Sequence, residues 1–115
     1  MKQISPRQAR VAEGVKQVIS GVILNGLGDP RISSLTVTDV EVSADLKVAH
    51  VFVTVFDKKS IELTLEGLNS AVSLFRRHIA SELNLKYTPD LEFFYDESLE
   101  RGARIESLLS SLRNK

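Results

Sequence analysis

Side chains able to do acid–base, nucleophilic or metal chemistry are few in this chain and poorly placed for it. There is no cysteine, and His50 and His78 stand in a predicted strand and a predicted helix without a serine motif or metal spacing nearby. Asp96-Glu97 better suits the start of a following helix, where acids are favoured. Gly26-Leu27-Gly28 follows a helix rather than a strand, unlike a dinucleotide-binding loop. We therefore expect no enzyme activity, no cofactor and no metal.

Basic side chains are the remaining candidates, because Lys and Arg neutralise the phosphates of RNA. The chain has 15 basic and 15 acidic residues, so its net charge is zero and only the placement of charge can favour RNA. Residues 2–16 and 76–86 are mainly basic, whereas residues 29–45 are mainly acidic. This segregation suggests a two-faced surface, with an evenly mixed, solvated surface as the alternative. The candidate RNA contacts are Arg7, Arg10, Arg76, Arg77, Lys86, Arg101 and Arg104.

The length of 115 residues predicts one domain over residues 1–115, large enough to form a core without disulfides or metal. The N-terminus has no long apolar run of the kind found in signal peptides. No stretch approaches the roughly 20 apolar residues that span a membrane. We expect a monomeric, cytoplasmic protein without membrane contact.

The first half of the chain predicts a helix followed by an antiparallel hairpin. Ser5-Pro6 is typical of a helix start, and residues 25–30 contain the glycines and proline that end one. Residues 35–37 and 40–42 alternate out of phase, which predicts a β-bulge between them. A turn is expected at residues 43–46, before the clearest strand, residues 48–56.

The second half predicts a long helix over residues 61–83, with Ser60 as its N-cap, and a third strand over residues 91–95. Leu74 lies off the apolar stripe of that helix, either as a single exposed leucine or because the helix bends and resets its faces. Arg76 flanks the stripe, whereas Arg77 points away from it and is the better candidate of the two for an RNA contact. A last helix over about 98–113, a candidate mobile segment, carries Arg101 and Arg104. The core should contain Phe52, Phe56, Phe75 and Phe93.

The predicted order is α-β-β-α-(kink)-α-β plus a C-terminal helix. One three-stranded sheet with helices on one face is the economical packing, which makes this an α+β fold. A short joint between adjacent helices is typical of a type II KH-like domain, an RNA-binding fold. Ordinary KH domains carry a GXXG clamp at that joint, whereas this chain has Ala71, Val72 and Ser73.

Several motifs together resemble the ribosome-binding factor A family. They are Asp29-Pro30-Arg31-Ile32, the run VTDVEVSADLKVAHVFVTVF from Val37, Leu68-Asn69-Ser70-Ala71 leading to Phe75-Arg76, and the run from Tyr87 to Ser98. The resemblance covers nearly the whole chain. The Ser-x-Asp-Leu turn and the Pro-x-Leu-x-Phe-x-x-Asp-x-Ser run are specific in combination.

The resemblance implies a KH-like fold in which a kinked Ala-x-Gly replaces the GXXG loop. It implies binding to the free 30S subunit, late maturation and processing of 16S rRNA, a role in cold adaptation, and no catalysis. Ribosomal proteins and assembly GTPases are further expected partners. Ser73 stands where glycine is usual, which bears on how sharply the helix bends.

Two other functions stay open on the residues alone. A generic single-stranded RNA module should show a clamp or stacking aromatics, and neither is evident in the sequence. A protein-interaction domain without a ribosomal role could use the hairpin edge or the C-terminal helix.

Overall fold

The computed structural model describes residues 4–26, 28–32 and 35–97, and within them the element order matches the predicted one. The short 3-10 helices η1 and η2 are additions, because single turns leave no periodic pattern in a sequence. The predicted helix over about 98–113 lies outside the described residues. The elements are α1 (Pro6–Leu24), η1 (Pro30–Ile32), β1 (Leu35–Val42), β2 (Val48–Val55), η2 (Lys58–Ser60), α2 (Ile61–Ser70), α3 (Val72–Glu82) and β3 (Asp90–Tyr95).

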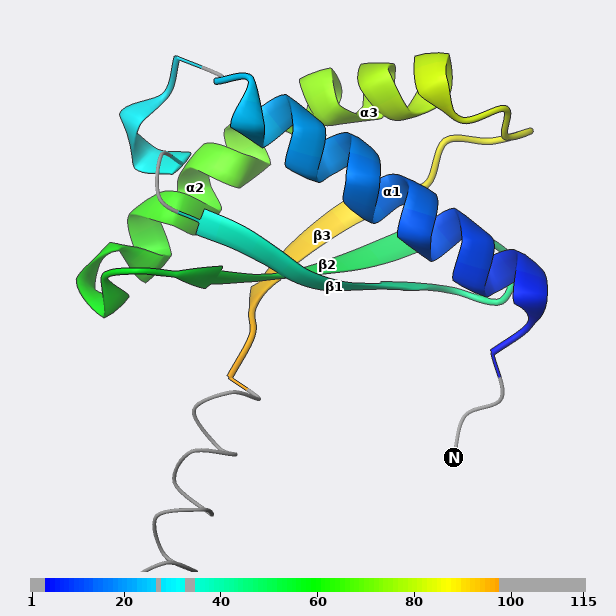
Figure 1. The fold of residues 1–115 in the computed structure, drawn as a ribbon, viewed down its shortest axis with the longest axis horizontal. Coiled ribbons are helices and arrows are strands. Elements are labelled where there is room, and N and C mark those ends of the chain that lie inside the picture. Colours follow the sequence, from blue (N-terminus) through cyan, green and yellow to red (C-terminus); the bar gives the residue numbers. More distant parts are fainter. Residues whose placement is uncertain (1–3, 27, 33–34, 98–115) are drawn as a thin grey trace, which may run out of the picture.

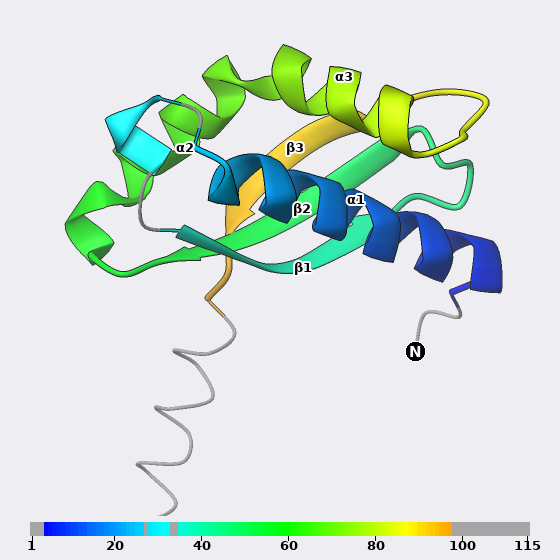
Figure 2. The ribbon, with the colours of Figure 1, turned by 45° about the horizontal axis from the view of Figure 1, so that its top comes forward.

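The sheet has the strand order β1-β2-β3, with β1 antiparallel to β2 and β2 parallel to β3. The helices of the described chain cover one face of this sheet, and α1 crosses it (Figures 1 and 2). The pairing of β1 with β2 shifts between Val37 and Asp39, which confirms the predicted bulge. The core lies between sheet and helices and includes Val15, Ile19, Val51, Val53, Leu68, Phe75, Ile79 and Phe93.

The start of α1 is determined by residues close together in sequence. The backbone N–H of Gln8 donates to the Ser5 hydroxyl, and the side chain of Gln8 accepts from the Ser5 N–H, so both parts of a capping box are present. Pro6 takes the first helical position, where its missing N–H costs nothing. The predicted helix start is therefore confirmed in atomic detail.

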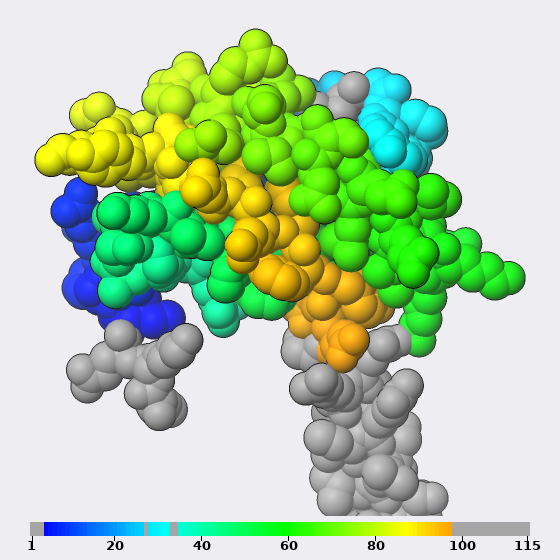
Figure 3. All heavy atoms as spheres, turned by 180° about the vertical axis from the view of Figure 1, so that it is seen from behind, coloured from blue at the N-terminus to red at the C-terminus, as the bar shows by residue number. Residues whose placement is uncertain are grey.

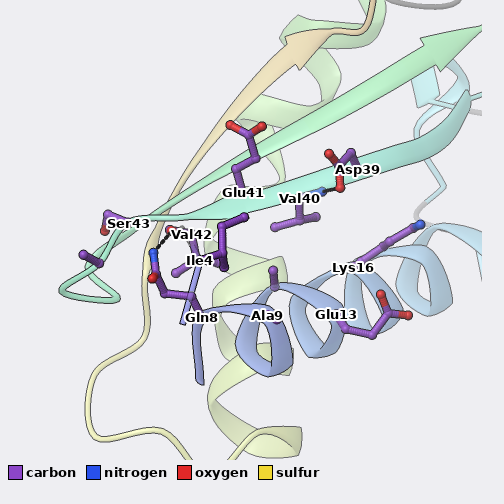
Figure 4. A pocket seen from close by; sticks show the side chains of 12 residues that line it. Ile4, Gln8, Ala9, Glu13, Lys16, Asp39, Val40, Glu41, Val42 and Ser43 are labelled. Atoms are coloured by element: carbon purple, nitrogen blue, oxygen red, sulfur yellow. Dashed lines mark hydrogen bonds between the residues drawn. The ribbon is translucent and has the colours of Figure 1, made fainter. Parts of the chain in front are cut away.

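The outer edge of β1 is protected against pairing with another strand. The Nε2 group of Gln8 donates to the Val42 carbonyl at 3.0 Å, and the Asp39 carboxylate accepts from the Val40 N–H at 2.9 Å. Satisfied edge groups of this kind discourage strand addition. Between α1 and β1 lies a groove of about 600 Å³, with Glu13, Lys16, Asp39 and Glu41 among its lining residues (Figure 4).

The long predicted helix is broken at Ala71, which separates α2 from α3. Ala71 has φ −97° and ψ 5°, which lies outside the helical region but at negative φ, and its N–H still donates to the carbonyls of Gly67 and Leu68. Leu74 is partly buried against the core, so the break resets the helix faces and Leu74 is not a lone exposed leucine. Ser73 lies inside α3, two residues beyond the break.

Replacing Ser73 by glycine should destabilise the protein by about 0.5–1 kcal/mol, because glycine weakens a right-handed helix and no positive φ is present there to favour it. Urea melts of the parent and Ser73→Gly proteins would measure the difference. An unchanged or raised free energy of unfolding would contradict a helical conformation with negative φ at Ser73.

Replacing Gly67 or Gly21 by alanine should have opposite effects on the stability of the protein. A Cβ at Gly67 in α2 would lie 2.9 Å from the Ile32 Cγ2 and 3.1 Å from the Arg31 Cβ, whereas a Cβ at Gly21 in α1 meets nothing within 4 Å. We expect Gly67→Ala to cost about 1–3 kcal/mol through overpacking. Gly21→Ala should stabilise by up to about 1 kcal/mol through helix propensity. Thermal melts should show a lower melting temperature for Gly67→Ala and a higher one for Gly21→Ala. Equal changes in melting temperature would contradict close packing of η1 on α2.

Three side-chain predictions are wrong. Phe56 follows the end of β2 and is 96 % exposed, and Phe52 is half-buried on the sheet face away from the helices. Ser60 makes no N-cap bond, because its hydroxyl donates instead to the Asp57 carbonyl. Phe56 lies beyond the end of β2, Ser60 is drawn into the turn of η2, and Phe52 alternates with the buried Val51 and Val53 and so points to the other face of the sheet.

Candidate nucleic-acid interface

The sheet face opposite α1, α2 and α3 carries carboxylates that do not favour RNA. Glu41 on β1 and Glu92 on β3 are exposed there, beside His50 on β2, whose Nε2 lies 2.8 Å from the Glu92 carboxylate. Phe94 stands edge-on to the His50 ring, with the ring centroids 5.2 Å apart. Carboxylates repel phosphates, so contacts to an RNA backbone are better placed on other surfaces.

The structure brings together basic residues from the two ends of the described chain. Arg7 on α1 and Lys86 in the loop between α3 and β3 line one groove of about 340 Å³. Arg10 lies three residues beyond Arg7 and therefore on the same side of α1. All three side chains are exposed. They form a basic group at the end of the molecule where α1 begins.

Arg76 is engaged in contacts within the protein, whereas Arg77 is exposed. The guanidinium of Arg76 donates to the carbonyls of Thr88 at 3.1 Å and Pro89 at 3.3 Å, and it lies 3.6 Å from the Asp90 carboxylate. It ties α3 to the loop before β3, so a stabilising role competes with the predicted RNA contact. Arg77 is exposed on α3, as predicted. Arg101 and Arg104 lie outside the described residues.

Two features of this region are missing from the sequence-based prediction. Tyr87, beside Lys86, is 64 % exposed, and the sequence pattern did not single it out as an exposed aromatic. Leu46 has φ 63°, the one positive φ outside glycine among the described residues. An aromatic residue next to a lysine in a proline-containing loop is the signal that could have indicated Tyr87.

Comparisons with known proteins bear directly on this arrangement. The sequence model of the ribosome-binding factor A family matches residues 7–109, nearly the whole chain. The chain belongs to the ribosome-binding factor A family. It is 46 % identical to ribosome-binding factor A of Halothermothrix orenii, over 95 % of this chain and 90 % of that protein. It is 42 % identical to that of Geobacter metallireducens, over 92 % and 91 % of the two chains.

Solved ribosome-binding factor A structures share the fold. The crystal structure from Thermus thermophilus superposes with a TM-score of 0.69 at 28 % identity, covering 76 % of this chain and 94 % of that one. A homology model of the Thermus thermophilus factor, fitted into a cryo-EM map of a complex with the 30S subunit, gives a TM-score of 0.61 at 26 % identity, with coverage of 83 % and 97 %. The α+β fold with one three-stranded sheet is thereby confirmed.

The Asp-Pro-Arg-Ile motif of the resemblance is structural in this member of the ribosome-binding factor A family. The Arg31 Nε and Nη2 donate to the Asp29 carboxylate, the shortest contact being 2.7 Å, and this pairing holds the pKa of Asp29 below its usual range. The Thr64 hydroxyl donates to the Arg31 carbonyl at 3.1 Å. The Thr64 bond holds η1 against α2, and the Asp29 carboxylate engages the Arg31 guanidinium, so we do not count Arg31 among the RNA contacts.

Two further findings apply only to residues 4–26, 28–32 and 35–97. No group of three or more His, Asp or Glu side chains is placed to hold a metal ion. No helix in this part of the chain is both long and apolar enough to span a membrane.

Proposed function

We propose that this protein binds the free 30S ribosomal subunit and supports late maturation and processing of 16S rRNA. The observation that carries the proposal is the family match over residues 7–109, together with a structural relative placed in a 30S complex. The basic group of Arg7, Arg10 and Lys86 supports RNA contact, because these exposed cations can neutralise phosphates.

The protein would act by binding alone, as a cytoplasmic factor without a cofactor. Its two histidines support this, since both lie beside a carboxylate on the surface: His50 beside Glu92, and His78 with its Nδ1 3.5 Å from Glu82. Neither pair includes a nucleophile or a buried base of the kind that catalysis requires. Cold adaptation belongs to the same proposal, because RNA misfolding is harder to escape at low temperature.

Sucrose-gradient fractionation of a cell extract tests the proposal. The protein should migrate with free 30S subunits and be depleted from assembled ribosomes. Absence from all ribosomal fractions would favour the protein-interaction domain without a ribosomal role. Migration with every RNA-containing fraction would favour a generic single-stranded RNA module.

A further inference from the structure

The groove that contains Arg7 and Lys86 is built from three segments far apart in the sequence. These are the start of α1, the turn between β1 and β2, and the loop between α3 and β3. Figure 3 shows the blue, turquoise-green and yellow segments meeting at one end of the molecule. The residues lining the groove are Ser5, Arg7, Ala44, Asp45, Leu46, Leu85, Lys86 and Tyr87.

The floor of the groove is apolar and held in a strained backbone conformation. Leu46 and Leu85 are partly buried against the core. Leu46 reaches this position with φ 63°, which is unfavourable for a bulky side chain. The Ser43 hydroxyl accepts from the N–H groups of Lys47 and Val48, which keeps the turn in this shape. Strain retained in this way is characteristic of binding sites.

The charge of the groove is positive on balance. Arg7 and Lys86 contribute two cations, against the single carboxylate of Asp45. That carboxylate is occupied by the turn itself, because it accepts from the Ser43 hydroxyl at 2.6 Å and from the Lys47 N–H at 3.0 Å. These bonds hold the pKa of Asp45 below its usual range, so the carboxylate keeps its charge and the cations outnumber it by one. None of the ion pairs found among the described residues includes Arg7 or Lys86, so both cations can contact an anion.

Tyr87 adds an exposed aromatic ring to this positive groove. Its side chain is 64 % exposed, and the Lys86 Nζ lies 5.6 Å from the ring centroid. Cations beside an exposed ring are the combination that binds single-stranded nucleic acid, since bases stack on the ring and phosphates contact the cations. A volume of about 340 Å³ suits one nucleotide and is too small for a duplex.

We propose that this groove binds one unpaired RNA nucleotide, with the base stacked on Tyr87 and its phosphate held by Arg7 and Lys86. The inference rests on the proposed function and deepens it, because it names the part of the RNA that is recognised. The Ser-x-Asp-Leu turn acquires a role as the floor of a nucleotide site. Recognition would then combine contacts to the RNA backbone with capture of an unstacked base.

Affinity measurements on purified free 30S subunits would test the site. Tyr87→Ala should weaken binding about 5- to 150-fold, the value of one stacked base. Tyr87→Phe keeps the ring and should bind as tightly as the parent. Phe56→Ala is the matched control, because Phe56 is an even more exposed aromatic at the opposite end of β2 and should not affect binding. Thermal melts would verify that all variants fold.

Ultraviolet cross-linking of the bound parent protein, followed by mass spectrometry, separates an RNA contact from a protein contact. A nucleotide adduct on the peptide containing Tyr87 is expected. Parent-like binding by Tyr87→Ala, or a loss of affinity without any adduct on that peptide in the parent, would overturn the nucleotide site while leaving 30S binding intact. Failure of the parent to bind 30S subunits would refute the proposed function itself and the site with it.

Discussion

Affinity of this protein for free 30S subunits should fall steeply as salt is added, even though the chain carries no net charge. Each neutralised phosphate contributes roughly 0.7–0.9 to the slope of log affinity against log salt concentration, because counterions are released from the RNA. Only the local surface has to be positive. Arg7, Arg10 and Lys86 supply such a surface, while carboxylates such as Glu41 and Glu92 lie on the sheet face opposite α1, α2 and α3.

Replacing Arg7, Arg10 and Lys86 together by alanine should flatten that slope by about 2–3 and weaken binding most at low salt. Lys59→Ala is the control, because Lys59 is an exposed cation in η2, beyond the far end of β2. Binding measured over a salt series would give both slopes. Salt-independent binding of the parent, or equal slopes for the triple variant and the parent, would exclude phosphate contacts by this basic group.

Alanine variants of Arg76 and Arg77 should differ in stability. Arg77→Ala should leave stability within about 0.5 kcal/mol, since the side chain is exposed and away from the core. Arg76→Ala, by contrast, should lower the free energy of unfolding by about 1 kcal/mol, because two hydrogen bonds to the loop before β3 are lost. Weaker binding by Arg76→Ala could therefore come from lost stability as well as from a lost RNA contact. Weaker binding by Arg77→Ala would come from the lost RNA contact alone.

The parts of the fold that depend on neighbouring residues could be predicted from the sequence. Ser5 and Gln8 form their capping box within one turn, and the phase slip around Thr38 produces the bulge in β1. The helix break was predicted for the same reason, since Leu74 lies out of phase with the stripe. Its exact place at Ala71 depends on the packing of α2 and α3, and the sequence alone does not show that packing.

Features that depend on distant segments could not be predicted. The exposure of Phe56 depends on where β2 leaves the sheet, and a strongly strand-forming sequence does not show that point. Arg7 and Lys86 meet only because the start of α1 and the loop before β3 lie at the same end of the sheet. The sequence therefore showed which side chains could bind phosphate, but not which of them lie together or that Tyr87 lines the same groove.

Loss of the protein should cause precursor 16S rRNA to accumulate and free 30S subunits to increase, most strongly at low growth temperature. The basic group and the adjoining groove offer a limited surface, so we expect selectivity to come from one shaped RNA–protein site rather than from a long sequence readout. If that site is accessible only before the subunits join, the factor binds free subunits and is excluded from assembled ribosomes.

A deletion strain would test both expectations. The ends of its 16S rRNA and the sucrose-gradient profile of its ribosomal subunits would be compared at low and normal growth temperature. The parent gene should restore both, and a gene carrying the triple alanine change at Arg7, Arg10 and Lys86 should restore neither fully. Lys59→Ala should restore them as the parent does, which separates the basic group from charge in general. Normal RNA ends in the deletion strain, together with equal affinity of the purified protein for free subunits and assembled ribosomes, would rule out a maturation role.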